Sequence, residues 1–106
     1  MRFGIWYGTL ASMKKLTVKT IIKKNRDVVQ KELNGITYLM NPHDKTVHTL
    51  NETASFIWKS FNTPTSIQMI ADKLTSEYKI DKHKALEDIL DFVEMYIDHD
   101  MILAST

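Results

Sequence analysis

The chain has 106 residues, of which 43% are apolar and 25% charged, and its net charge is +1. These values are typical of one globular domain with a modest core. Cysteine is absent, which excludes disulfides, thiolate zinc sites and cysteine nucleophiles and fits a cytoplasmic protein. No apolar run reaches the roughly 18–20 residues of a membrane helix, so we expect no membrane contact.

The charge is distributed unevenly along the chain. Residues 1–45 carry nine Lys and Arg against three Asp and Glu, whereas residues 46–106 carry five against ten. We interpret residues 13–24 as a basic, solvated and partly flexible arm, with a docking surface for an acidic partner as the alternative. The cations of this half of the chain lie mainly at Lys14, Lys15, Lys19, Lys23, Lys24, Arg26 and Lys31.

Residues 1–12 differ from the rest of the chain in composition. They contain Phe3, Trp6 and Tyr7, and a second methionine, Met13, precedes a lysine-rich start. Their apolar core is too short for a secretory signal. We interpret residues 1–12 as a leader derived from an expression vector, with the native start at Met13; the alternative is an aromatic strand added to a sheet edge.

The next part of the chain has the pattern of β-strands. Leu16–Ile22 is rich in β-formers and is expected to form a strand or an extended arm. Val28–Leu33 and Ile36–Asn41 flank Asn34-Gly35, the dipeptide favoured by a two-residue type I′ hairpin turn. Thr46–Leu50 follows a Pro-containing turn. The sequence therefore predicts a three-stranded antiparallel meander.

Three helices are expected after the meander. Asn51 is a good N-cap for the first helix, Thr65 and Gln68 have capping-box spacing for the second, and Asp81 caps the third. The third helix is expected to end near His99, with residues 101–103 packing back as a tail. The fold class predicted is α+β, with a winged helix-turn-helix-like arrangement.

The third helix has an unusually wide apolar surface. At 100° per residue, its apolar residues cover an arc of about 160°. One flank is expected to pack on the core and the other to face a groove or a partner; the alternative is that both flanks are buried. The opposite side is acidic and carries Glu87, Asp88, Asp91, Glu94 and Asp98.

Three short motifs together resemble the PqqD-like family, named for pyrroloquinoline-quinone biosynthesis. They are Leu50-Asn51-Glu52 followed by Ile57-Trp58, then Thr65–Ala71, then Asp88–Val93. The resemblance covers residues 25–103, and we assign residues 25–106 to a PqqD-like domain. It implies a recognition element that binds the leader of a ribosomally made, post-translationally modified peptide. Thr53 and Phe56 depart from the small residues usual in the family's first helix.

The resemblance also implies where a leader would bind. In similar proteins the leader adds as a strand beside the third strand of the meander and lies against the third helix, which is the mode called β-augmentation. The peptide-binding residues carried over from the family are Thr46, Val47, His48, Thr49, Leu50, Ala85, Leu86, Asp88, Ile89 and Phe92. Asp88 is expected to pair with a polar or cationic leader group or to orient the backbone, and exposure on the acidic face is the alternative.

The partners implied are the precursor leader peptide and a maturation enzyme, such as a radical S-adenosylmethionine enzyme or a leader peptidase and cyclase. We expect a non-enzymatic protein without cofactor or metal. Only His83 and Glu87 have metal-ligand spacing, and two ligands make a poor site. Lys82, His83 and Lys84 are expected to be exposed, with acidic leader residues as alternative partners.

Two other functions remain open from the residues alone. A winged helix-turn-helix protein that binds nucleic acid would need cations on its recognition helix, but residues 87–100 carry only acids among their charges. The basic residues near the N-terminus keep this alternative open. A homodimer or scaffold module that pairs through the exposed strand edge is the second alternative.

Overall fold

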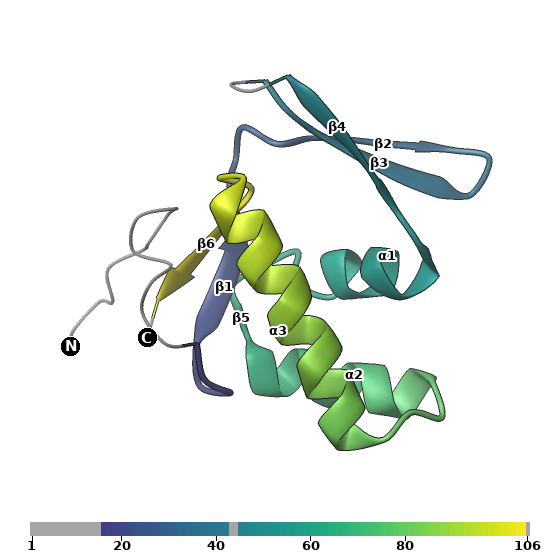
Figure 1. The fold of residues 1–106 in the computed structure, drawn as a ribbon, viewed down its shortest axis with the longest axis vertical. Helices are drawn as coiled ribbons and strands as arrows, with labels where there is room; N and C mark the ends of the chain where they lie inside the picture. The colour runs from purple at the N-terminus through teal and green to yellow at the C-terminus, as the bar shows by residue number, and fades with distance from the viewer. Residues whose placement is uncertain (1–15, 43–44, 106) are drawn as a thin grey trace.

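The computed structural model describes residues 16–42 and 45–105, which form two small sheets and three helices (Figure 1). The chain is α+β, as the sequence predicts. In chain order the elements are β1 Ile21–Lys24, β2 Val29–Leu33, β3 Ile36–Asn41, β4 Thr46–Leu50, α1 Glu52–Lys59, β5 Thr65–Ser66, α2 Ile67–Glu77, α3 Lys82–Asp98 and β6 Ile102–Ser105.

The predicted meander is confirmed, with strand order β2-β3-β4. Asn34 and Gly35 both have positive φ, 53° and 80°, which is the type I′ geometry that their sequence favours. This turn pairs Leu33 with Ile36 and fixes the register of β2 against β3. The second hairpin pairs β3 with β4 antiparallel.

A second sheet, in the order β5-β1-β6, was not predicted as such. Part of the range expected as a basic arm forms its central strand, β1, in which Ile22 is fully buried. The expected C-terminal tail is a strand, β6, that pairs with β1. This sheet forms by pairing between strands that are far apart in the sequence, and local sequence patterns do not reveal such pairing.

Two of the three predicted helix caps are confirmed. The Asn51 side chain accepts a hydrogen bond from the Ala54 N–H at 2.8 Å, and Asp81 caps α3. The capping box at Thr65 and Gln68 is wrong: Ser66 is the N-cap of α2, because its hydroxyl accepts from the Met69 N–H, whereas the Thr65 hydroxyl donates to the Thr63 carbonyl.

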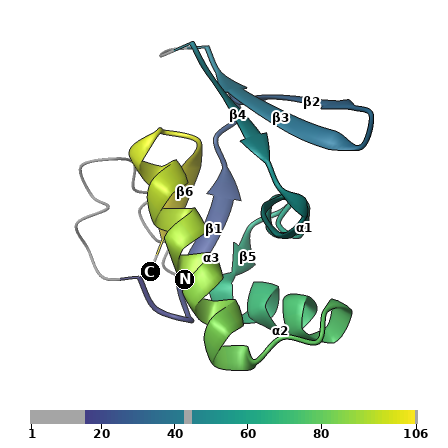
Figure 2. The ribbon, with the colours of Figure 1, turned by 45° about the vertical axis from the view of Figure 1, so that its right-hand side comes forward.

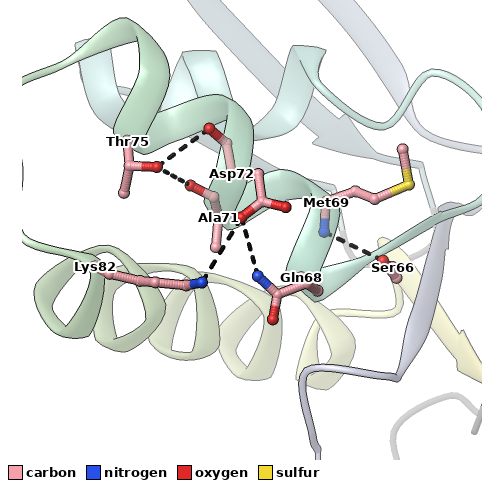
Figure 3. Close-up of polar contacts among 7 residues, drawn as sticks. All are labelled: Ser66, Gln68, Met69, Ala71, Asp72, Thr75 and Lys82. Carbon is pink, nitrogen blue, oxygen red and sulfur yellow. Dashed lines mark hydrogen bonds and ion pairs between the residues drawn. The ribbon is translucent and has the colours of Figure 1, made fainter.

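The helices α2 and α3 lie side by side and share a polar contact (Figure 3). The Asp72 carboxylate accepts a hydrogen bond from the Gln68 amide at 3.0 Å and lies 3.9 Å from the Lys82 ammonium. Lys82 therefore contacts an acid of its own chain.

The helix α1 packs beneath the inner face of the meander (Figures 1 and 2). The Trp58 indole N–H donates to the Gln30 side chain at 2.8 Å, and Ser55 and Thr37 share a hydroxyl hydrogen bond of the same length. Around this contact lies the main core, which includes Ile22, Leu39, Ile57, Trp58, Phe61, Ile67, Ile70, Leu74, Ile89, Ile97 and Ile102.

In the described ranges, no helix is long and apolar enough to cross a membrane. The interpretation of residues 1–12 as a foreign leader concerns residues outside the described ranges.

Candidate functional site

The strand β4 forms an edge of the meander, since only β3 pairs with it in the described part of the chain. The two-residue turn makes Leu33–Ile36 a hydrogen-bonded pair, and such pairs alternate with non-bonded pairs along an antiparallel ladder. When this alternation is followed across β3 to β4, the backbone N–H and C=O groups of Leu50 and His48 point toward β3. The N–H and C=O groups of Val47 and Thr49 therefore face outward.

The side chains of β4 alternate between the two faces of the sheet. Leu50 is buried and His48 is half-buried on the inner face, whereas Thr46 is exposed. On the outer face Thr49 is exposed, and Val47 has 61% of its surface accessible. The five residues that the family resemblance implicates thus form one edge strand, of which Thr46, Val47 and Thr49 are exposed and Leu50 is buried.

An aromatic cluster joins β4 to the C-terminal half of α3. The His48 ring lies 5.2 Å from the Tyr96 ring and 4.6 Å from the His99 ring, measured between centroids. The Phe92 ring lies 4.7 Å from that of Tyr96. Burial raises the pKa of Tyr96, which favours its neutral phenol. The cluster packs the C-terminal half of α3 against the inner face of β4.

A pocket of about 270 Å³ lies between the first turn of α1 and the middle of α3. We call it the α1–α3 pocket. Its apolar part comes from Ala54, Ile57 and Phe92, of which the last two are buried. It is lined by Asn51, Thr53, Ala54, Ile57, Asp88, Asp91 and Phe92.

The predicted residues of α3 occupy different depths. Asp88 and Phe92 line the α1–α3 pocket. Leu86 is half-buried against the core, and Ala85 and Ile89 are fully buried behind the pocket wall. The wide apolar arc of α3 is therefore mostly covered by the protein itself.

Sequence reasoning missed five of the residues that line this pocket. Asn51, Thr53, Ala54 and Ile57 come from α1 and its cap, and Asp91 comes from α3. A carboxylate three residues after Asp88 was the available signal for Asp91, because residues at i and i+3 are neighbours on a helix.

Asp88 has a cationic partner on its own helix. The Lys84 ammonium lies 3.1 Å from its carboxylate and 3.7 Å from that of Glu87. The hydrogen bond to Asp88 and the two negative charges raise the pKa of Lys84. Lys84 is therefore already partnered by acids on its own helix.

A second, larger pocket of about 710 Å³ lies on the other side of α1. Gly35 and Ile36 of the hairpin, Phe56 of α1 and Tyr78 are among its lining residues. The Tyr78 hydroxyl donates to the Glu52 carboxylate at 3.3 Å. Partial desolvation and, after it, the charge of Glu52 raise the pKa of Tyr78. Phe56 packs edge-to-face on Tyr78, with ring centroids 5.4 Å apart.

The described residues contain no group of three or more His, Cys, Asp or Glu side chains placed to hold a metal ion. His83 and Glu87 are both exposed on the first turns of α3.

Comparison with known proteins gives a family and a fold. The family model described as coenzyme PQQ synthesis protein D, PqqD, matches residues 37–102, which is more than half of the chain. A search of curated proteins found no match.

Two solved structures share the fold. One is TbiB1 in complex with the TbiA(beta) leader peptide, with a TM-score of 0.70 and 21% identity over 76% of this chain and 93% of that chain. The other is lasso peptide synthetase B1 complexed with the leader peptide, with a TM-score of 0.69 and 22% identity over 76% of this chain and 95% of that chain.

Proposed function

This chain belongs to the PqqD family, and from that premise we propose that it binds the leader segment of a ribosomally synthesised precursor peptide by strand addition at β4. It presents the bound precursor to a maturation enzyme, such as a radical S-adenosylmethionine enzyme or a leader peptidase and cyclase. The observation that carries the proposal is the outer edge of β4, with which no second strand pairs in the described ranges, and the α1–α3 pocket nearby. Two proteins of the same fold are each in complex with a leader peptide.

The outward backbone groups of β4 supply the affinity in this proposal. Val47 and Thr49 each offer one N–H donor and one C=O acceptor to an extended chain. A peptide that pairs with them points alternate side chains to opposite faces of the extended sheet. One set turns toward α3 and the other toward the outer face of the sheet. The backbone hydrogen bonds then supply affinity, and the pockets that receive side chains fix the register of the peptide.

The chemistry of maturation belongs to the partner enzyme in this proposal. The chain itself acts as a non-catalytic binding protein, which agrees with its family. Its residues hold and orient the leader, and no bond of the precursor is made or broken on this chain.

Val47→Pro tests the strand-addition step. Proline removes the outward N–H of Val47 and places its ring at the edge. The dissociation constant of a fluorescein-labelled leader peptide, identified by screening the products of short reading frames that neighbour this gene, is expected to rise at least tenfold. Fluorescence polarisation measures it.

Val47→Ala is the matched control. It keeps the N–H and removes most of the side chain, so its dissociation constant should stay within about threefold of the parent. Far-ultraviolet circular dichroism should be the same for both variants, because proline is tolerated at an edge position whose N–H faces away from the sheet. Equal affinity of Val47→Pro and the parent would overturn the proposal.

The same preparation separates the two alternatives. Binding of duplex DNA with micromolar affinity, without binding of the leader peptide, would favour a nucleic-acid function. A concentration-dependent dimer in sedimentation, abolished by Val47→Pro, would assign the β4 edge to self-association.

A further inference from the structure

The α1–α3 pocket is acidic. Its two ionisable lining side chains, Asp88 and Asp91, are both carboxylates. They are three residues apart on α3, which places them on adjacent turns of one helix side. No cation from the described part of the chain lines the pocket, although Lys84 bonds to Asp88 from one turn away. The pocket therefore carries net negative charge.

Asp91 differs from Asp88 in its partners. In the ranges 16–42 and 45–105, no ion pair or side-chain hydrogen bond engages the Asp91 carboxylate. Asp88 is half-buried and shares its charge with Lys84, whereas Asp91 is exposed. Among the described residues, one acid of the pocket thus has a cationic partner and the other has none.

Apolar side chains form part of the pocket lining, beside the polar ones. Ile57 is 1% exposed and Phe92 7%, and Ala54, which is half-buried, is the third apolar lining residue. A volume of about 270 Å³ is just below the range of roughly 300–1,000 Å³ typical of small-molecule sites. The pocket therefore suits one side chain of a bound peptide and not a folded segment.

We propose that this pocket selects a lysine or arginine of the bound leader, with its aliphatic stem against Ile57 and Phe92 and its cation at Asp91. The inference rests on the proposed function, because strand addition at β4 delivers the peptide. Lysine and arginine bury their stems on apolar surface while their heads stay in water. A charge-assisted hydrogen bond then holds the cation at the carboxylate. A peptide glutamate at this position meets the negative charge of Asp91 and is rejected.

Selection from random peptides tests this preference without knowledge of the natural precursor. The full chain, immobilised, is offered an mRNA-displayed library of random 14-residue peptides, and Val47→Pro is selected in parallel. Peptides that depend on Val47 should show Lys or Arg enriched at one alignment position, with Asp and Glu depleted there. Enrichment of apolar residues alone at every position would overturn the inference.

A double-mutant cycle assigns the preference to Asp91. A selected peptide with lysine at that position is compared with its norleucine variant, which keeps the stem and removes the charge. Asp91→Asn should weaken the lysine peptide about threefold to fivefold, which is the effect of a partly exposed ion pair. It should leave the norleucine peptide within 1.5-fold. The threefold to fivefold effect should shrink in 0.5 M NaCl.

Glu94→Gln is the matched control, since it removes one negative charge from an exposed residue of α3 that does not line the pocket. It should change the affinity for the lysine peptide less than 1.5-fold. Equal losses of affinity in Asp91→Asn and Glu94→Gln would show that the effect comes from the overall charge of the protein, and they would overturn the inference. In that case, peptide binding that still depends on Val47 would continue to support the proposed function. If no selected peptide depends on Val47, both proposals fail.

Discussion

Asn51 stands at the junction on which the candidate site depends. It follows β4 directly, caps α1 through its side-chain oxygen and lines both pockets. Its role as a cap follows from the sequence, because capping needs only residues within four positions. Its place between two pockets does not, because α3 and Tyr78 reach it from distant parts of the chain.

Replacing this cap should destabilise the protein measurably. Asn51→Ala leaves the Ala54 N–H without its acceptor and should lower the free energy of unfolding by about 1 kcal/mol. Asn51→Ser, which retains an acceptor oxygen, should lose only a few tenths of a kcal/mol, as a rough figure. Urea unfolding monitored by tryptophan fluorescence measures both. An Asn51→Ala variant as stable as the parent would show that the cap contributes nothing.

The same distinction between local and distant causes holds for the residues of α3. Helical periodicity and the family motif point to Asp88 and Phe92, which line the α1–α3 pocket. Periodicity also groups Ala85 and Ile89 with Phe92, but both are fully covered. A helical wheel shows which residues share a face. It does not show which part of that face other elements cover.

Among the elements, the meander is the most predictable because its determinants are short-range. The Asn34-Gly35 turn and the alternation of side chains fix both the strands and their register. The second sheet depends instead on pairing between residues far apart, such as Ile22 with Thr65 and with Ala104. A two-residue strand like β5 has no periodicity of its own to detect.

Gly35 tests how much the turn contributes to stability. Its φ of 80° is unfavourable for any side chain, but a Cβ there would have no atom within 4 Å. Gly35→Ala should therefore cost about 1 kcal/mol of unfolding free energy from backbone conformation alone. Gly35→Asn should cost less, since asparagine tolerates this region better. Equilibrium urea unfolding compares the three proteins, and a cost above about 3 kcal/mol for alanine would contradict this account.

At the scale of the whole molecule, two sheets flank one helical core. The meander carries the candidate binding edge, and β1, β5 and β6 form a separate sheet below it, whose strand β6 contacts α3 (Figure 1). The family model begins at residue 37 and so leaves out β1 and β2. Nevertheless Ile22 of β1 belongs to the same buried cluster as Trp58 and Ile102.

Two neighbouring isoleucines of β1 show whether this strand is part of the cooperative fold. Ile22 is fully buried, whereas Ile21 is 41% exposed. Ile22→Ala should lower the free energy of unfolding by about 2–5 kcal/mol, because it leaves a cavity in the core. Ile21→Ala, the matched control, should cost less than about 1 kcal/mol.

The loss in Ile22→Ala is a large share of the roughly 5–15 kcal/mol that stabilises a typical domain, so the measurement is best made at low temperature in urea. Neither isoleucine lines the α1–α3 pocket or belongs to β4. Under folding conditions both variants should therefore bind the labelled leader peptide within twofold of the parent. Equal, small losses of stability in the two variants would mean that β1 unfolds independently of the core. A selective loss of peptide affinity in Ile22→Ala, with the fold intact, would mean that the N-terminal strand communicates with the binding edge.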